Sequence, residues 1–526
     1  MKTSAFLFSL AFALAGSLAC FAATGSKVAV ANPATGTPDG FFGITNLYAF
    51  HLTIAPDQWA IMEQPDDIQA HAPRPENNND ESRGFRPAPA TGRDRNGPGP
   101  TRNGPTPGAE FQKGTATLEF QGQPWGALRV RFKGHSSFRF AGHSLKRSLK
   151  LDFNDLEKGR TFFGLTKLNL NNNAMDPSQL REALAYHIFR SAGVPAGRTA
   201  FAKVFITVPG QCERAYAGLY TIVEQVDERF LKARFGSKHG MLLKPEQLVG
   251  LPYLGDAWAA YTNRVQAKTA FTTNDASRFI EFVRCLNSAD AAHFQAAMAE
   301  YVDLDEFLRF LAVQALLSNL DSPLRSGHNY YLYLHPQTRK FLWLPWDLNE
   351  AFGAFGPGGS ASLQVDLSLD QPFTSENRLA ARVLQAPGMK QRYHTILRGL
   401  LAADFNPERL FPVMHAMAAT IRSAVAGDPM VSLPQFEAAL ADWSQPGTRA
   451  ADLAERSAPR RGGPDGPGAG PGPRLPLQAF ITQRVASARL QLEGKTTGYV
   501  PREMPQEPRG EGPGGRGRAD LIPRTW

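Results

Sequence analysis

Polar side chains interrupt two apolar stretches in the second half of the chain. Asp321 follows a long helical pattern, and Asn329 precedes the apolar run YYLYL. Asp347 ends the apolar run FLWLPW, with Asn349 two residues later. Phosphoryl transfer uses such a set, because one carboxylate orients the acceptor hydroxyl while an amide and a second carboxylate hold Mg²⁺ against the phosphates. Asn329, Asp347 and Asn349 would supply the oxygen ligands that this cation prefers. Each residue alone could equally stabilise a turn.

The first half of the chain offers basic partners for such a site. RVRFKGHSSFRF is typical of a strand and a glycine-containing loop with Ser136, and KRSLKLDF of a strand carrying Lys146 and Lys150. A loop over phosphates followed by a strand lysine would bind ATP. This loop has no GxGxxG, so a surface hairpin with solvated lysines is the alternative. Glu182, in the first turn of a predicted helix, could pair with such a lysine or interact with the helix dipole. Glu224 ends a strand where a connector between lobes is expected.

The order of the expected elements predicts an α+β fold. Strand-like sequence fills the first half, with one embedded helix in DPSQLREALAYHIFRSAGVP that Asp176 or Ser178 could cap. Residues 275–318 and 376–445 have helical patterns, and LQAFITQRVASARLQLEG predicts a last helix. We therefore expect two lobes, the second one helical at its C-terminal end.

Other catalytic classes lack their motifs. The sequence contains no GxSxG nucleophile elbow, no HExxH zinc motif and no GxxxxGK[ST] phosphate loop. His187 lies on an apolar helix face, where a core role is the simpler interpretation.

The chain has 526 residues and a formal net charge of +9. Much of the basic excess lies in Arg/Pro/Gly-rich stretches such as GFRPAPATGRDRNGPGPTRNGP, without interleaved aromatic residues. Because charge in such segments usually solvates a disordered chain, we predict no nucleic-acid partner. These basic segments could instead associate with the cell envelope. The sequence does not indicate an oligomeric state.

The first residues have the pattern of a secretory signal. One Lys, an apolar run and small residues precede a cleavage site expected after Ala22 or Ala23. The pattern favours export over lipoprotein anchoring at Cys20 and over a membrane anchor, because the apolar run is short for a span. We therefore expect an extracytoplasmic location, either periplasmic, secreted or on the cell surface. Cys212 and Cys285 could then form a disulfide or remain two free thiols.

Composition divides the rest of the chain. We expect a signal peptide over 1–23, a main domain over 40–395 and a helical region over 396–494. Disordered Pro/Gly/Arg-rich segments are expected at 65–112 and 457–475, and a disordered tail at 495–526, because few large apolar side chains occur there.

Four stretches together resemble the CotH family of spore-coat-protein-H-like atypical protein kinases. They are KGHSSFRFAGHSLKRSLKLDFN, LNLNNNAMDPSQLREALAYHIFRSAGVPAG, GLYTIVEQVDERFL and HNYYLYLHPQTRKFLWLPWDLNEAFG. The resemblance covers roughly residues 40–395 without the Pro-rich insertion. It implies a diverged kinase-like fold that binds ATP with Mg²⁺ or Mn²⁺ and phosphorylates Ser/Thr of secreted or surface proteins.

The resemblance also implies roles for single residues. Asp321 resembles the catalytic-loop Asp, Asp347 the metal-binding Asp, and Asn329 the Asn before the aromatic strand. Lys146 and Lys150 both fall in the family's lysine-rich segment, so the lysine that contacts phosphate stays open. Glu182 falls in the helix after D-x-S, and Glu224 where a hinge residue would meet adenine.

Two positions depart from the family's pattern. Lys133-Gly134-His135-Ser136 stands where RGNS is common, and Asn349 stands where WDLD is common. An amide at 349 coordinates Mg²⁺ with one charge less. Three hypotheses follow: an active exported kinase, a catalytically inactive structural or adhesive surface protein on the same fold, and an enzyme that transfers nucleotide instead of phosphate.

Overall fold

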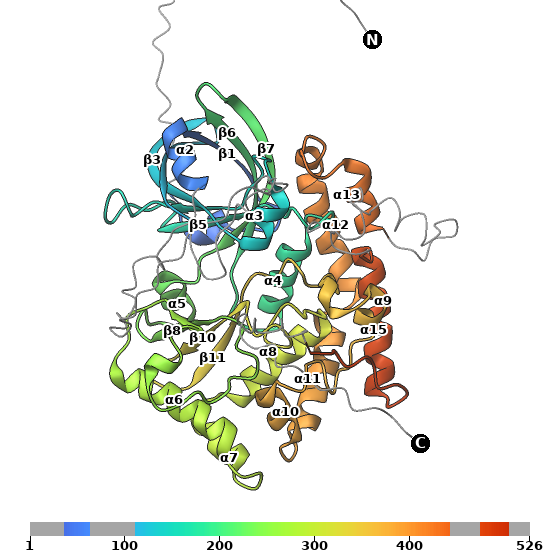
Figure 1. Ribbon diagram of the computed structural model, residues 1–526. Coiled ribbons are helices and arrows are strands. Elements are labelled where there is room, and N and C mark those ends of the chain that lie inside the picture. Colours follow the sequence, from blue (N-terminus) through green and yellow to red (C-terminus); the bar gives the residue numbers. More distant parts are fainter. Residues whose placement is uncertain (1–35, 64–110, 442–473, 504–526) are drawn as a thin grey trace, which may run out of the picture.

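A barrel and a helical body with a small sheet make up the part of the chain that the structure describes (Figure 1). The computed structural model describes residues 36–63, 111–441 and 474–503. The mixed α+β composition agrees with the prediction.

The barrel is closed by strands in the order β1-β2-β3-β4-β5-β7-β6. Neighbouring strands are antiparallel except β1 and β6, which are parallel. The strands are β1 (Leu47–Ile54), β2 (Gly114–Phe120), β3 (Gln123–Phe132), β4 (Leu149–Asp152), β5 (Lys167–Asn171), β6 (Thr199–Val208) and β7 (Cys212–Glu224).

Alternation along β3, β4 and β5 gives this part of the barrel an apolar inner face and a polar outer face. Leu128, Leu151 and Leu168 are fully buried in one apolar core. Arg131, Lys150 and Asn169 lie side by side in register across the three strands, on the other face. Lys150, one of the two lysines expected to contact phosphate, is therefore on the outside of the barrel.

The second sheet has the order β11-β10-β8-β9. The predicted apolar pair is β10 and β11, which are antiparallel with Tyr330 opposite Pro345, and β11 forms one edge of the sheet. The strands are β8 (Met241–Pro245), β9 (Val265–Ala267), β10 (Tyr330–Leu334) and β11 (Phe341–Pro345).

Helix α4 lies between the barrel and the helical body (Figure 1). It begins at Arg181, after an N-cap position at Leu180 that has no side-chain cap; Asp176, one of the two expected cap residues, instead accepts the Arg181 N–H at 2.9 Å from the preceding turn. The remaining helices are α1 (Pro38–Phe41), α2 (Pro56–Glu63), α3 (His135–Ala141), α4 (Arg181–Ser191), α5 (Glu228–Phe235), α6 (Thr273–Ser288), α7 (Phe294–Tyr301), α8 (Leu304–Leu316), α9 (Ala361–Val365), α10 (Arg378–Gln385), α11 (Met389–Ala403), α12 (Pro407–Val425), α13 (Leu433–Leu440) and α15 (Leu477–Leu492), with short 3₁₀ turns η2 (Trp258–Ala260) and η3 (Gly356–Gly358).

The helical body and the small sheet share one apolar core. Helices α11, α12, α13 and α15 contribute Leu397, Met417, Phe436 and Phe480 to the same cluster that contains the centre of β10. The expected boundary at residue 396 therefore does not separate two cores.

Some expectations about the irregular segments need correction. Phe111, expected in a disordered insertion, is buried, and Arg474 and Leu475 contact the helical body. Residues 495–503, expected in a disordered tail, are ordered: the Ser368 N–H donates to the Tyr499 carbonyl at 2.7 Å. The predicted signal peptide, the rest of both insertions and the tail beyond 503 lie outside the described residues.

Two further features concern the cysteines and the character of the described helices. Both Cys212 and Cys285 are free thiols. Among the described helices, none combines the length and the apolar character that crossing a membrane would need.

Candidate functional site

The structure brings Asp321 and Asn329 into direct contact. The Asn329 amide nitrogen donates to the main-chain oxygen of Asp321 at 2.9 Å and to its Oδ2 at 3.0 Å. The Oδ1 of Asp321 lies 3.0 Å from Nε2 of His328. Burial disfavours protonation of His328, but the hydrogen bond and charge of Asp321 outweigh it and raise the pKa of this imidazole. The loop between α8 and β10 therefore presents a fixed carboxylate beside an amide.

The Asp347 loop is tied to the same place. The Trp346 N–H donates to the Asn329 carbonyl at 3.1 Å, which joins the end of β11 to the start of β10. Asn329 has φ +61° and Asp347 has φ +52°. Left-handed backbone is uncommon outside glycine and is enriched where function requires a particular side-chain direction. The side chains of Asp347 and Asn329 thus extend from neighbouring backbone positions, and the backbone conformation is constrained at both.

A lysine and two carboxylates face each other across the barrel and α4. Lys133, just after β3, donates to Asn171 Oδ1 at 2.5 Å. The Asn171 amide nitrogen in turn donates to both carboxylate oxygens of Glu182 at 2.8 Å. The Lys133 ammonium also lies 5.5 Å from the centre of the Trp346 ring, next to Asp347. We call Lys133, Asn171, Glu182 and Asp347 the acidic cluster.

Charge is unbalanced in the acidic cluster. Burial, and after it the charge of Asp347, raise the pKa of Glu182 to about 7. Burial lowers the pKa of Lys133 although Asp347 and Glu182 favour its charged form. One ammonium therefore faces two carboxylates, and a protonated Glu182 is one way to relieve the excess negative charge.

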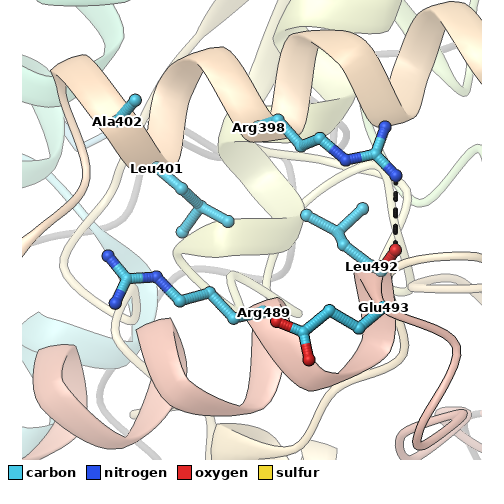
Figure 2. Close-up of a pocket in the computed structure, with 6 residues that line it drawn as sticks. All are labelled: Arg398, Leu401, Ala402, Arg489, Leu492 and Glu493. Carbon is cyan, nitrogen blue, oxygen red and sulfur yellow. Dashed lines mark hydrogen bonds between the residues drawn. The ribbon is translucent and has the colours of Figure 1, made fainter.

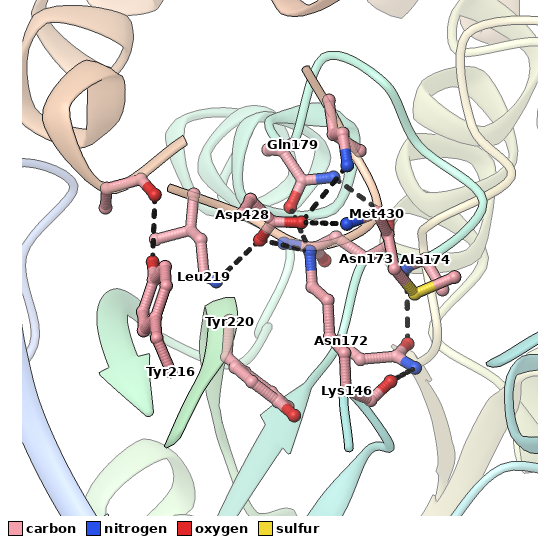
Figure 3. Close-up of polar contacts among 12 residues, drawn as sticks. Lys146, Asn172, Asn173, Ala174, Gln179, Tyr216, Leu219, Tyr220, Asp428 and Met430 are labelled. Carbon is pink, nitrogen blue, oxygen red and sulfur yellow. Dashed lines mark hydrogen bonds and ion pairs between the residues drawn. The ribbon is translucent and has the colours of Figure 1, made fainter. Parts of the chain in front are cut away.

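Lys146 is held elsewhere, which corrects the expectation for it. It precedes β4 instead of lying on it, and its side chain is fully buried. Its Nζ lies 2.6 Å from Asp428 Oδ2 and 3.2 Å from Gln179 Oε1 (Figure 3). Asp428 also accepts the Leu219 N–H at 2.8 Å. Lys146 therefore connects the barrel to the turn after α12, and its charge is already neutralised.

Glu224 also has other partners than those expected. Its buried carboxylate accepts from the Arg198 backbone and side chain, each at 3.0 Å, and lies 3.2 Å from Arg234. These contacts orient the Glu224 side chain toward Arg198 and Arg234. The Glu224 side chain therefore fixes the end of β7, and the contact with adenine expected at this position stays a prediction.

Lys150 and Ser136 stay predictions. Lys150 is half-buried on the outer face of β4, opposite Arg131 and Asn169. Ser136 is exposed on the short helix α3.

Asn349 is half-buried, and its role as a metal ligand also stays a prediction. The next residue, Glu350, was not singled out from the sequence. It lies 2.9 Å from Arg474, and burial, its largest influence, raises its pKa to about 7. The charge of Asp321 adds to this rise. Glu350 thus links the Asp347 loop to the C-terminal segment.

The donors fit a hard divalent cation bound together with phosphates. Asp347 and the Asn329 amide oxygen would supply two oxygen ligands, since the amide nitrogen is the atom of Asn329 that contacts Asp321. The described residues contain no group of three or more His, Cys, Asp or Glu that could hold a metal by itself. Magnesium and manganese commonly take one or two protein ligands and complete their shell with phosphate and water. Within the acidic cluster two carboxylates face one ammonium, which favours a cation there, and Arg131 and Lys244 act on Lys133 with smaller opposing influence.

A separate shallow pocket of ≈ 260 Å³ lies between α11 and α15 (Figure 2). Arg398, Leu401 and Arg489 line it, and Arg398 donates to the Leu492 carbonyl at 3.2 Å. No residue of the acidic cluster lines this pocket, so it is not part of the candidate site.

The alternation of apolar and polar residues before Lys133 was a signal in the sequence for the face on which this lysine lies. Composition alone does not show it. Leu128, Val130 and Phe132 alternate inward, which places Arg129, Arg131 and the following Lys133 on the outer face. The same outer face of β5 carries Asn171. Their meeting depends on the β3-β4-β5 order, which the sequence did not show.

The fold and site define an α+β protein with paired carboxylates on two adjacent loops. Residues 130–444 match the family described as CotH kinase protein. The chain belongs to the CotH family.

Two curated relatives come from Bacillus subtilis. The chain is 28% identical to inner spore coat protein H over 51% of this chain and 72% of that protein. It is 23% identical to inner spore coat protein H-like protein over 53% of this chain and 75% of that protein. Among solved structures, the Helicobacter pylori proinflammatory kinase CtkA matches with a TM-score of 0.21 and 12% identity, over 53% of this chain and 90% of that chain.

Proposed function

We propose that this chain is an exported atypical protein kinase that uses ATP and Mg²⁺ or Mn²⁺ to phosphorylate Ser/Thr of a secreted or surface protein. The observation that carries the proposal is the arrangement of Asp321, Asn329 and Asp347 on two hydrogen-bonded loops facing the Lys133–Glu182 pair. The family's description as a kinase protein supports the same reaction class.

Each side chain of the site has a chemical task in this proposal. Asp321, held by Asn329 and His328, accepts a hydrogen bond from the acceptor hydroxyl and orients it. Lys133 neutralises phosphate charge, and Asn171 with Glu182 keeps its ammonium in place. Asn329 and Asp347 would hold the divalent cation. ATP with its metal supplies the activated phosphoryl group.

The extracytoplasmic location rests on the N-terminal pattern of charge, apolar run and small residues. A secreted or cell-surface protein is therefore the proposed substrate class, and the basic Pro/Gly-rich segments are proposed to contact the cell envelope. Fractionation of the native cells with an antibody tests this part. Recovery of the uncleaved chain in the cytoplasm would contradict it.

The alternative function is a catalytically inactive surface protein on the same fold. Asn349 favours it, because an amide there lowers the negative charge offered to a metal. Thermal unfolding with and without ATP plus Mn²⁺ separates the two functions. A ligand that binds only the folded state raises the midpoint by mass action, whereas an unchanged midpoint favours the inactive protein.

Intact mass spectrometry tests the reaction directly. A candidate surface protein is incubated with ATP, Mn²⁺ and either the wild type, Asp347→Ala or Asp290→Ala, an exposed control. We expect phosphate-sized mass gains with the wild type and the control, and none with Asp347→Ala. A gain of the size of AMP would instead indicate nucleotide transfer, and full activity of Asp347→Ala would refute the metal assignment.

A further inference from the structure

The residues beyond the family match pack against both loops of the site. The match ends at residue 444, whereas Arg474–Glu503 is ordered and includes α15. Figure 1 shows α15 beside α9, and α9 follows the Asp347 loop in the sequence. The question is what these residues contribute to the site.

Arg484 is the central contact of this segment. Its side chain is fully buried, and its guanidinium donates to the carbonyls of Val365 at 3.0 Å, Leu367 at 2.6 Å and Ala315 at 2.9 Å. Ala315 lies in the last turn of α8, six residues before Asp321. Val365 and Leu367 end the segment that follows Asp347. One side chain thus joins the last turn of α8, which precedes the Asp321 loop, to the end of α9, which follows the Asp347 loop in the sequence.

Arginine suits this position because its planar fork can serve several carbonyls at once. The carbonyls near the end of α8 also carry partial negative charge, which a cation stabilises. Burial of a guanidinium whose hydrogen-bond acceptors are main-chain carbonyls is costly, and burial lowers the pKa of Arg484 to about 10. Because burial of its guanidinium is costly, Arg484 has a specific structural role and does not merely occupy space in the core.

A second contact joins the start of the segment to the Asp347 loop. Arg474 lies 2.9 Å from Glu350 and donates to the Met175 carbonyl, next to Asp176. Arg181 at the start of α4 donates to the carbonyls of Phe352 at 3.4 Å and Leu475 at 2.9 Å. The turn before α4 and the Asp347 loop are therefore connected through Arg474 and Leu475.

The end of the segment crosses the same region. The Tyr499 N–H donates to the Asp366 carbonyl at 2.6 Å, and its carbonyl accepts the Ser368 N–H at 2.7 Å. Arg325, in the loop between Asp321 and Asn329, donates to the Arg502 carbonyl at 2.7 Å. Close approach requires Gly498, because a Cβ there would lie 2.7 Å from the Asp366 carbonyl oxygen.

We propose that Arg474–Glu503 is a clamp that holds the Asp321 and Asp347 loops in their relative positions, with Arg484 as its main positioning residue. The proposal concerns the same site as the proposed function and, for its kinetic part, rests on it. The clamp acts on geometry: its contacts described above are with α8, the end of α9, the two loops and the turn before α4, whereas Lys133 and Glu182 are held by Asn171.

The first experiment compares Arg484→Met with Arg489→Met, its exposed neighbour on α15. Hydrogen exchange of the full chain is measured at residues 317–329 and 361–369. We expect faster exchange at both segments in Arg484→Met only, while β3 to β5 keep the wild-type rates. Equal exchange in both variants would overturn the clamp, whether or not the protein is a kinase.

Kinetics give the second readout. A misplacement of about 1 Å at a reacting centre can cost about 10²-fold, so we expect kcat of Arg484→Met to fall by about 10- to 100-fold. The KM for ATP should change by less than about threefold, since Lys133 and Glu182 stay in place. Arg484→Lys should recover part of kcat. An unchanged kcat in Arg484→Met would refute the clamp, whereas a wild type without phosphate transfer would refute the proposed function alone.

Substitutions at two glycines provide a further test in case Arg484→Met does not fold. Gly494 and Gly498 have almost the same backbone, with φ +74° and +73°. A Cβ at Gly494 meets nothing within 4 Å, whereas one at Gly498 collides with the main chain near Asp366 and Ser368. Gly498→Ala should therefore accelerate exchange at 361–369 and lower kcat, and Gly494→Ala should do neither. Identical behaviour of the two variants would contradict the clamp.

Discussion

Two lysines of this molecule have buried ammonium groups but differ in the charged groups that surround them. Lys146 forms a closed pair with Asp428, and Gln179 and the Leu219 N–H complete the contacts. Lys133 instead faces the two carboxylates of Glu182 and Asp347, partly through Asn171. The first arrangement is balanced, and the second has an excess of negative charge.

A lysine that binds a ligand and a structural lysine differ in the balance of charge around them. A balanced, fully buried pair has no capacity for another charged ligand, and breaking it leaves a buried charge without a partner. An unbalanced cluster at the junction of two loops can accept a divalent cation and phosphate. The charged groups around each lysine therefore determine whether it is structural or can bind phosphate. Its position in the sequence does not determine this.

The largest expected effect is on stability. Lys146→Met leaves Asp428 buried without its cation, and loss of one partner of a buried pair costs about 3–5 kcal/mol of unfolding free energy. Urea denaturation measures it, with the exposed Lys232→Met as control. A loss below about 1 kcal/mol, the value typical of a surface pair, would remove the distinction between the two lysines.

Lys133→Met should have the reverse profile. We expect phosphate transfer to fall by about 10²-fold, as on removal of one preorganised electrostatic group. The unfolding free energy should fall by less than in Lys146→Met, because Glu182, whose pKa is raised to about 7, can take up a proton when the ammonium is lost. Rates are measured by phosphate incorporation, with the exposed Lys158→Met as control. If Lys133→Met kept the wild-type rate, phosphate binding would have to be reassigned, with Lys150 as the next candidate.

The acidic cluster also predicts a pH dependence of stability. The pKa of Glu182 rises from an ordinary 4.5 to about 7 in the folded protein. Between these values the folded state holds a proton that the unfolded chain has released, so stability is highest below the window and falls as pH rises through it. Glu182→Gln should flatten the fall of the melting midpoint by a few degrees. The exposed Glu281→Gln should keep the wild-type slope, and an equal slope in both variants would refute the assignment.

The smallest expected effect is at Asn349. Asn349→Asp adds one negative charge near the metal ligands and should strengthen Mn²⁺-dependent ATP binding by a few-fold. Titration of the thermal midpoint with Mn²⁺ at fixed ATP measures the change. Weaker binding in Asn349→Asp would place residue 349 outside the metal's surroundings.

Local sequence patterns predicted the part of the site that is local in the fold. The apolar runs before and after residues 335–340 form the antiparallel pair β10 and β11 because both strands are buried. Asp321 and Asn329 meet because the loop between α8 and β10 is short and folds back on itself. The first turn of α4 places Glu182 as expected from the helix boundary.

Long-range contacts could not be predicted in this way. The choice among Lys133, Lys146 and Lys150 depends on Asp428, which is 282 residues from Lys146 in the sequence. Arg474 ends a Pro/Gly-rich stretch whose composition indicated disorder, and Arg484 lies in a helix that the sequence predicted without showing what the helix contacts. Glu224 resembled a hinge residue, although Arg198 and Arg234 fix its side chain through tertiary packing.

The central claim is that the acidic cluster and the Asp321 loop form a site for metal-bound ATP. Calorimetric titration of ATP into the wild type and Lys133→Met, with and without Mn²⁺, tests it most directly. We predict binding to the wild type only when Mn²⁺ is present, and strongly weakened binding to Lys133→Met under the same conditions. Absence of ATP binding to the wild type, or equal binding to both proteins, would contradict the claim.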